Sequence, residues 1–361
     1  MRGFLEEEPE RVPHELIDAV ERMRQHPACA ARRLQREDPA GTRDGSFDLE
    51  TAVGRRGVDL GCVDRVTVEF SQQFRIACGR VSLLAFRSSM RSAITVSLVP
   101  ETKGGPFVYS SGLEPAAVEA AALGFDALEI FPPSADALVA TGWLEVLQAH
   151  GLRAAAVGTG AGWVTRGLNL TLPEAERRLE ARAFIREIIT VAARAGAPAI
   201  LGSMQGRCPA GVTREQALSW LGEALEELGG YASGLGVTLL YEPLNRYETN
   251  LFHRLGEAAA WLRTLRTRNV RLLADLFHMN IEEVSLEDAV REAGSLVGHV
   301  HFADSNRRAV GFGHTDVVPV IAALREVEYD GYLSAEVLPW PDPSTAARQT
   351  RDAFRRATTA G

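Results

Sequence analysis

The chain has 361 residues, of which 46% are hydrophobic and 24% are charged, and its formal net charge is −8 at pH 7. These values are typical of a soluble globular protein, and the acidic balance argues against a nucleic-acid partner, which usually needs a basic surface. No apolar run approaches the roughly 18 residues that cross a membrane, and the acidic N-terminus lacks the apolar core of a secretory signal, so we predict a cytoplasmic protein without a membrane partner.

Residues 1–92 do not share the pattern of the remaining chain. They contain charge clusters, a stretch rich in Pro, Gly and Asp around residues 39–46, and three of the four cysteines. The cysteines show no paired spacing, so neither a disulfide framework nor a cysteine zinc site is predicted. We predict an N-terminal extension over residues 1–92, either poorly ordered or a small added segment, followed by a barrel domain over residues 93–361.

From residue 93 onward, short apolar runs alternate with helical patterns. Helices are expected at 114–123, in a segment ending at 150, and at 172–195, 213–228 and 344–358, with capping sequences that start at Thr171 and Thr213. The expected strands are 94–99, 126–131, 153–157, 198–202, 237–241, 270–275, 297–301 and 332–336. Such alternation requires a parallel sheet, and eight strands indicate an α/β fold of the closed (β/α)8 TIM barrel type.

A doubly wound open sheet is the alternative fold. It would need a phosphate loop or a dinucleotide fingerprint after an early strand. The glycine-rich segment from Gly158 to Trp163 is not followed by the expected glycine or helix start, so the barrel is favoured.

Each of the last four expected strands ends in a side chain that can bind a metal: Glu242, Asp275, His301 and Glu336. The spacing between successive members is about that of one strand plus one helix. Because active sites of such barrels lie at the carboxyl ends of the strands, we expect these four side chains to form one site. Three carboxylates and one imidazole make an oxygen-rich site that favours Mn²⁺, with Mg²⁺ or Co²⁺ as alternatives, over structural zinc.

Residues 93–358 resemble the sugar phosphate isomerase/epimerase family with the xylose isomerase-like barrel, and most closely its D-tagatose/D-psicose 3-epimerase branch. The resemblance rests on segments that contain the four side chains or lie close to them. They are Glu242-Pro-Leu-Asn-Arg-Tyr-Glu248, Asp275-Leu-Phe-His278-Met-Asn, His301-Phe-Ala-Asp-Ser-Asn-Arg307, Gly313-His-Thr-Asp316 and Glu336. It implies that Glu242, Asp275, His301 and Glu336 hold a divalent metal.

The resemblance also implies that Glu242 and Glu336 are the catalytic acid/base pair. Glu248, His278 and Arg307 would then hold substrate oxygens. A metal that chelates a ketose carbonyl and the neighbouring hydroxyl acidifies the carbon-bound proton between them and stabilises the enediolate. Two carboxylates on opposite faces would give epimerisation, whereas one base acting between neighbouring carbons would give aldose–ketose isomerisation.

The early strands depart from this family pattern. We expect Lys103, Gln205 and Arg207 to lie near the catalytic mouth and to bind substrate, although Lys103 and Arg207 could equally be solvated loop charges. Glu129 could orient a substrate hydroxyl or pair with Lys103. Trp163 and Phe107 could stack on a sugar or only seal a loop.

The function favoured is therefore a metal-dependent sugar isomerase or epimerase with a small-molecule carbohydrate substrate. A lyase or dehydratase that acts on a keto-sugar, inosose or keto-glycoside through the same site is the alternative. A nuclease of the apurinic-endonuclease type would need further histidines on the second and third strands, where this chain has Glu129 and Gly158. The resemblance implies a homo-oligomer, a dimer or tetramer formed through the later helices.

Overall fold

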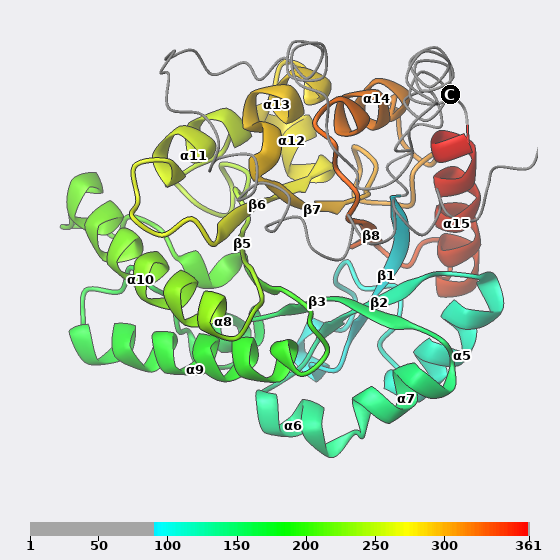
Figure 1. Ribbon diagram of the computed structural model, residues 1–361, viewed down its shortest axis with the longest axis horizontal. Helices are drawn as coiled ribbons and strands as arrows, with labels where there is room; N and C mark the ends of the chain where they lie inside the picture. The colour runs from blue at the N-terminus through cyan, green and yellow to red at the C-terminus, as the bar shows by residue number, and fades with distance from the viewer. Residues whose placement is uncertain (1–89, 360–361) are drawn as a thin grey trace, which may run out of the picture. The chain divides into compact units, whose positions relative to one another are not determined.

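Eight parallel strands close into a barrel in the order β1 to β8, surrounded by helices (Figure 1). The computed structural model describes residues 90–359. The strands are β1 (Arg91–Ser97), β2 (Ala127–Phe131), β3 (Arg153–Gly158), β4 (Ala199–Leu201), β5 (Leu239–Tyr241), β6 (Val270–Asp275), β7 (Val297–His301) and β8 (Tyr332–Ala335). Pairing of β1 with both β2 and β8 closes the barrel, so the predicted TIM barrel is confirmed and the open sheet is excluded.

The helices follow the strands in the expected alternation, with short 3₁₀ turns between some of them. The α-helices are α5 (Leu113–Leu123), α6 (Ala135–Ala140), α7 (Trp143–Ala149), α8 (Ala161–Arg166), α9 (Ala175–Ala193), α10 (Arg214–Gly234), α11 (Leu255–Leu262), α12 (Leu276–Glu282), α13 (Leu286–Ala293), α14 (Val318–Glu326) and α15 (Pro343–Thr359). The 3₁₀ turns are η1 (Pro100–Thr102), η2 (Ser203–Gln205) and η3 (Gly294–Leu296).

The N-terminal extension expected over residues 1–92 falls outside the described residues except at its last three positions, and it stays a prediction. The barrel itself begins slightly earlier than expected. Arg91 is already paired with Tyr332 in the register between β1 and β8. The first strand therefore starts at Arg91, because the neighbouring strand offers a partner for that residue.

The two helix caps expected at Thr171 and Thr213 have different outcomes. Thr213 caps α10, since its side chain accepts a hydrogen bond from the backbone N–H of Gln216 at 3.2 Å. Thr171 does not cap α9, which begins at Ala175 after Glu174. The hydroxyl of Thr171 instead accepts from the backbone N–H of Arg207 at 2.9 Å, so a tertiary contact has replaced the local cap. A short helix, α8, starts at Ala161, inside the glycine-rich segment from Gly158 to Trp163, where no helix start is expected from the sequence.

Side chains along a barrel strand alternate between the interior and the outer helices. On β6 the interior positions are Arg271, Leu273 and Asp275, from the amino to the carboxyl end. Leu273 packs in the barrel with Ile200 and Leu240. The larger apolar core lies between the barrel and the helices. β5 and β6 therefore carry an apolar middle, Leu240 and Leu273, below the polar residue at the mouth, whereas β7 carries His299 at the middle position.

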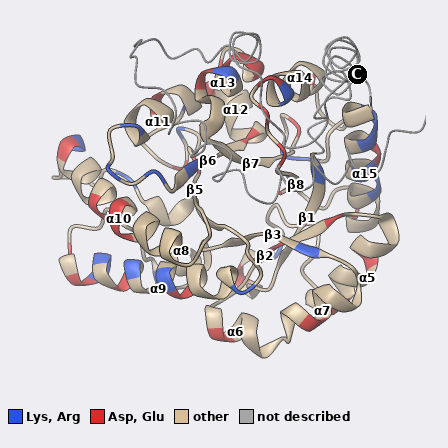
Figure 2. Ribbon diagram, in the orientation of Figure 1, with Lys and Arg blue, Asp and Glu red and all other residues tan. Residues whose placement is uncertain are grey.

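Charged side chains lie on the outer helices, with both signs on α9 and mainly acidic residues on α10 (Figure 2). Between these two helices, Arg182 forms ion pairs with Glu227 at 3.2 Å and with Glu223 at 3.8 Å. Within residues 90–359, no helix is both long and apolar enough to cross a membrane. The predicted cytoplasmic location and homo-oligomer stay predictions.

Candidate metal centre and active site

Four consecutive strands deliver the four side chains expected from the sequence to one point. Asp275 and His301 are the last residues of β6 and β7, and Glu242 and Glu336 directly follow β5 and β8. All four are buried, with at most 6% of each residue exposed. Because parallel strands in a barrel end at the same face, four strand ends in register bring their side chains together.

The ring of His301 lies at the centre of the group. Its Nδ1 atom is 3.2 Å from Oδ2 of Asp275, 3.4 Å from Oε1 of Glu242 and 3.8 Å from Oε2 of Glu336. Glu242, Asp275 and His301 offer ligand atoms that all lie within 4.8 Å of one another. Three carboxylates therefore lie within 3.8 Å of one buried ring nitrogen, and Glu242, Asp275 and His301 are close enough to share one cation.

The second nitrogen of the His301 ring is bonded to Glu129, a residue of β2. Nε2 of His301 is 3.0 Å from Oε1 of Glu129, and Nε2 of His299 is 2.6 Å from Oε2 of the same carboxylate. Glu129 is fully buried. Glu129 is therefore paired with two histidines and not with Lys103, and the expected contact with a substrate hydroxyl stays a prediction.

Burial and charge act in opposite directions on these groups. Burial alone would raise the pKa of Glu129, but His301 and His299 hold that pKa below its usual range. Burial would lower the pKa of His301, but Glu129 and Glu336 raise it well above its usual value. The local field therefore strongly favours positive charge at this ring.

The residues present fit a divalent cation. Glu129 orients the His301 ring and accepts from Nε2, as carboxylates do behind metal-bound histidines, which leaves Nδ1 directed at the three carboxylates. Their lone pairs converge in a place where solvent is largely excluded. Uncompensated buried charge of this kind is costly, and a bound cation relieves it. The donor set is hard and oxygen-rich, with one nitrogen, as expected for Mn²⁺, Mg²⁺ or Co²⁺.

His278 lies beside this cluster on the first turns of α12. Its Nδ1 accepts from the side-chain amide of Asn245 at 2.7 Å and from the backbone N–H of Asn245 at 3.4 Å. Two donors to Nδ1 place the ring hydrogen on Nε2. That atom has no hydrogen-bond partner among the described residues, and it lies 3.6 Å from Oδ2 of Asp275 and 3.9 Å from Oε1 of Glu242. His278 therefore presents a buried N–H donor at the site.

Arg307 and Glu248 close the other side of the group. Arg307 donates from Nη2 to Oε2 of Glu336, and its Nη1 is 3.7 Å from Oε1 of Glu248. The guanidinium also stacks over the ring of Phe277 at 4.8 Å. Burial raises the pKa of Glu336 against the opposing charges of Arg307 and His301, so this carboxyl holds a proton more readily than an exposed glutamate.

The loop that carries Arg307 is organised around one buried carboxylate. Asp304 accepts from the backbone N–H groups of Ser305, Gly311, Gly313 and Thr315 at 2.7 to 2.9 Å. Burial opposes ionisation of Asp304, but these four donors hold its pKa below the usual value. Arg307 itself has a φ of 58°, an uncommon left-handed conformation for a side chain of this size. Asp304 is thus what holds the loop, and Arg307 with it, over the site.

A cavity of about 290 Å³ opens beside Glu242, Glu248, His278, Arg307 and Glu336, and we call it the mouth cavity. These five residues supply its polar side. Strands β2 and β4 and the segments that follow β1, β3 and β4 supply the opposite side, through apolar residues and through Glu101, Thr102, Thr159 and Ser203. The apolar residues are Val99, Pro106, Phe107, Phe131, Ala161, Val164 and Ile200. The cavity therefore has one wall that carries the candidate reactive groups and a second wall of mixed character that contains most of the apolar residues.

The residues expected from the early strands lie apart from this cavity or are engaged elsewhere. Lys103 and Arg207 are exposed, and neither belongs to the residues that line the mouth cavity. Gln205 is buried, and its amide nitrogen donates to the backbone oxygens of Glu242 and Gly202 at 2.7 and 3.1 Å. Phe107 lines the cavity, whereas Trp163 does not. Gln205 thus holds the backbone of Glu242, and substrate contacts of Lys103, Gln205 and Arg207 stay predictions.

Several residues of the site were not predicted from the sequence. Asn245 and Asp304 lie inside the segments that carry the family resemblance, between residues to which a role was assigned. His299 lies two positions before His301 and therefore faces the same side of the strand, which is a signal that periodicity could have used. Gly202 gives no such signal, because its role depends on a contact with Glu242, which follows the neighbouring strand β5 but lies 40 positions later in the chain.

Comparison with known proteins gives one match to a family profile. Residues 117–357 match the profile described as xylose isomerase-like TIM barrel. A D-psicose 3-epimerase of Agrobacterium fabrum is 32% identical over 174 residues, which cover 46% of this chain and 60% of that relative. A D-psicose 3-epimerase of Ruminiclostridium cellulolyticum is 31% identical over 226 residues, or 60% of this chain and 75% of the relative.

A 3-dehydro-D-guloside 4-epimerase of Escherichia coli is 31% identical over 185 residues, or 48% of this chain and 70% of the relative. Among solved structures, D-psicose 3-epimerase with D-tagatose from Clostridium cellulolyticum H10 gives a TM-score of 0.61 at 22% identity, covering 75% of this chain and 99% of that one. The apo 3-keto-D-glucoside 4-epimerase from E. coli gives 0.62 at 23% identity, covering 75% and 100%. At these identities the structural matches support the fold alone.

Gly202 leaves space for the Glu242 carboxylate. A Cβ at Gly202 would overlap Oε2 of Glu242, so Gly202→Ala must displace that carboxylate. We expect the affinity for Mn²⁺ to fall about 10- to 100-fold, as when a residue that supports a metal ligand is lost. Calorimetric titration of the chelator-treated protein with Mn²⁺ measures this. Gly230→Ala on α10 is the control, since a Cβ there meets no atom within 4 Å; equal affinities in both variants would contradict the assignment.

Asp304→Asn places an amide where the carboxylate now accepts four backbone hydrogen bonds. We expect a loss of about 3 kcal/mol in the free energy of unfolding, because an NH₂ group would face backbone N–H donors. The pKa of Asp304 is lowered from 3.8, so its stabilisation is present above pH 3.8 and is lost as the pH falls through the lower native value. Thermal unfolding at neutral and acid pH measures the difference.

The matched control for this loop is Asp316→Asn. Asp316 is exposed, and its carboxylate accepts a hydrogen bond from the backbone N–H of Val318 at 3.0 Å. That variant should unfold close to the wild-type temperature. If both variants unfold alike at neutral pH, Asp304 does not organise the loop.

Proposed function

Because the chain belongs to the xylose isomerase-like TIM barrel family, we propose that it is a divalent-metal-dependent isomerase or epimerase of a keto-sugar or sugar derivative. The observation that carries the proposal is that Glu242 and Glu336 both line the mouth cavity and both approach Nδ1 of His301. Two carboxylates at a cation site provide an acid/base pair beside a group that can polarise a carbonyl. Homologues that are named as sugar epimerases support the same class of reaction.

In this proposal Glu242, Asp275, His301 and Glu336 hold the cation, with Mn²⁺ favoured and Mg²⁺ or Co²⁺ as alternatives. A bound divalent cation would withdraw electrons from the substrate carbonyl and stabilise negative charge that develops on the adjacent oxygens. Glu129 and His299 contribute indirectly, because they orient the ring of His301.

The protein's own groups move the proton. Glu242 removes the proton from the carbon next to the carbonyl, and Glu336 returns one to the opposite face, which inverts that carbon. Burial raises the pKa of Glu336, which suits it to the acid role. Arg307 orients Glu336 through its Nη2 hydrogen bond, and Nε2–H of His278 donates to a substrate oxygen in the buried half of the cavity.

The walls of the mouth cavity support an unphosphorylated substrate. Among the described residues that line it, Arg307 is the one Arg or Lys side chain, and it is already paired with Glu336. Lys103 and Arg207, which could have bound a phosphate, are exposed and lie outside the lining. An apolar wall opposite the carboxylates suits the carbon face of a neutral sugar, as in pockets that combine a few placed polar groups with apolar surface.

The first experiment follows hydrogen exchange at carbon. The Mn²⁺-loaded protein is incubated in D₂O with ketoses, keto-glycosides and inososes, and each mixture is followed by proton NMR. We expect the signal of a proton next to the carbonyl to disappear while an epimer or an aldose appears. Glu242→Gln and Glu336→Gln should each lower the rate by at least about 100-fold, since each removes one proton-transfer group.

Asp316→Asn, an exposed carboxylate on the β7–α14 loop, is the control for the loss of a charge near the mouth and should leave the rate unchanged. A vinylic or released-aglycone signal would move the assignment to the lyase or dehydratase alternative. Normal exchange in both glutamine variants would overturn the acid/base assignment.

Removal of the cation gives a second test. Treatment with a chelator should abolish exchange, and Mn²⁺ should restore it. The thermal midpoint should also rise on addition of Mn²⁺, because a ligand that binds the native state alone stabilises it. Full exchange by the chelated protein, with no bound metal by elemental analysis, would refute the metal-dependent mechanism.

A further inference from the structure

A second cavity, of about 650 Å³, opens at the opposite end of the barrel, at the amino ends of the strands. We call it the base cavity. Its rim includes Gly196 and Pro198 before β4, Val237 before β5 and Asp330 before β8. The four candidate metal ligands face the other end, whereas His299, which is bonded to Glu129 behind them, also lines the base cavity. The base cavity shares no lining residue with the mouth cavity and contains none of the candidate ligands.

Three arginines line the base cavity: Arg91, Arg153 and Arg271. They come from the first residues of β1 and β3 and from the second residue of β6. Asp330 is the one carboxylate among the described residues of the lining. This concentration of positive charge contrasts with the formal net charge of −8 for the whole chain.

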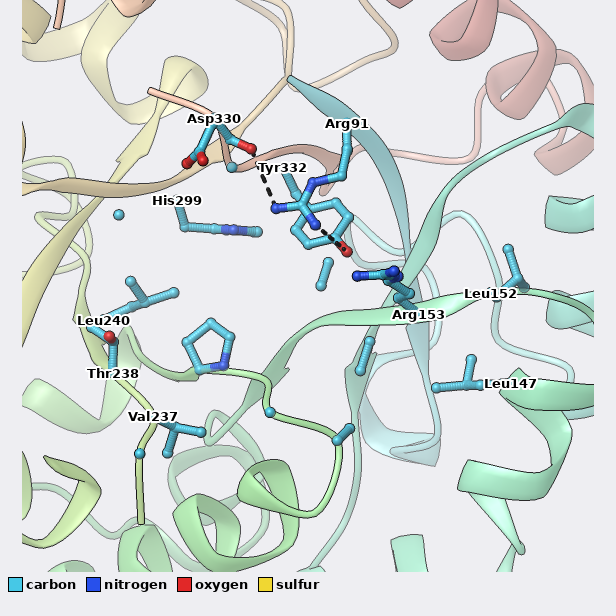
Figure 3. Close-up of a pocket in the computed structure, with 18 of the residues that line it drawn as sticks. Arg91, Leu147, Leu152, Arg153, Val237, Thr238, Leu240, His299, Asp330 and Tyr332 are labelled. Carbon is cyan, nitrogen blue, oxygen red and sulfur yellow. Dashed lines mark hydrogen bonds between the residues drawn. The ribbon is translucent and has the colours of Figure 1, made fainter. Parts of the chain in front are cut away.

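The three guanidinium groups differ in the hydrogen bonds that they already form. Arg91 donates to the hydroxyl of Tyr332 and to the backbone oxygen of Asp330, both at 3.2 Å, and lies over the Tyr332 ring at 4.2 Å. Arg153 and Arg271 are exposed, and neither side chain forms a hydrogen bond or ion pair within residues 90–359. Figure 3 shows Arg91, Arg153 and His299 directed toward the same space. Two arginines are thus free to bind a ligand there.

Small residues at two irregular positions make room for this space. The register shifts between β2 and β3 and between β6 and β7, and it leaves Ala155 and Gly298 without a partner across the ladder. Both residues line the base cavity. A Cβ at Gly298 would lie 2.7 Å from Cβ of Arg271. The glycine therefore leaves room for the aliphatic part of the Arg271 side chain to pack against β7. The cavity is built by the fold and does not result from a loose surface loop.

We propose that the base cavity binds a small organic phosphate. Guanidinium groups match phosphate oxygens with paired, charge-assisted hydrogen bonds. Leu147 and Leu152 on one side and Val237 on the other supply apolar surface for the organic part of the ligand (Figure 3). The volume lies in the range of small-molecule sites, and it exceeds that of the mouth cavity. The arginines at this end of the barrel select a ligand with negative charge. The substrate proposed for the mouth cavity is neutral, so the two cavities bind different molecules.

The test is calorimetric titration of the full-length, chelator-treated protein with D-ribose 5-phosphate, with D-ribose as the uncharged control. Without metal, the carboxylates of the mouth cavity repel a phosphate. We expect saturable binding of the phosphate but not of D-ribose. Arg153→Gln and Arg271→Gln should each weaken that binding about tenfold or more, as expected when a charged hydrogen-bonding partner is lost.

Two control variants test whether the phosphate binds in the base cavity rather than elsewhere on the protein. Arg356→Gln removes an exposed arginine from α15, and Arg207→Gln removes one from the segment that follows β4; both should bind the phosphate as the wild type does. Thermal midpoints of all variants establish that each is folded. The proposal is overturned if wild-type binding is not saturable, if Arg356→Gln weakens it equally, or if the loss occurs in Arg207→Gln and not in the base-cavity variants.

Discussion

The convergence of three buried carboxylates on Nδ1 of His301 is the constraint on which the rest of the site depends. Carboxylates held this close in a low-dielectric interior repel one another, and removing them from water is costly. The surrounding residues reduce that cost. Arg307 binds Glu336, His278 directs a donor toward Asp275, and His301 is held between this group and Glu129. Positive charge is needed at the centre, and the architecture is organised to accept it.

The two halves of the barrel contribute differently to this arrangement. Strands β5 to β8 and the loops after them supply the four candidate ligands, the donor on His278 and the loop of Arg307. Strands β1 to β4 supply most of the apolar wall of the mouth cavity and one decisive buried group, Glu129. Loops of the early strands can therefore vary the shape of the mouth cavity without disturbing the reactive side chains, as is typical when one fold supports many substrates.

The sequence predicted the features that depend on periodicity and strand order. An apolar run that ends in a carboxylate or histidine identifies a strand and its mouth-facing residue together, so Glu242, Asp275, His301 and Glu336 could be grouped from the order of residues alone. Features that depend on contacts between distant segments could not be predicted in this way. The space that Gly202 leaves for Glu242 is one example, and the contact of Thr171 with Arg207 in place of a helix cap is another.

Loop residues were the least predictable, because strand order fixes where a loop begins but not which of its side chains turn inward. Lys103 and Arg207 follow early strands as expected, yet both are exposed to solvent. Arg307 does face the site, because the buried Asp304 ties its loop down through four backbone hydrogen bonds. Burial of that one aspartate follows from tertiary packing, which the sequence pattern does not reveal.

The contacts of Glu129 with His299 and His301 span 170 and 172 positions of the chain. The four candidate ligands all lie within residues 242–336, so a half-formed barrel could already bring them near one another. Their orientation is different, because the ring of His301 is fixed only after β2 has joined the sheet with β7 in place. Long-range contacts of this kind form late, since the entropy of closing the intervening chain must first be overcome. The metal centre is thus coupled to completion of the ring of strands, and a chain that has failed to close its barrel would lack an ordered centre.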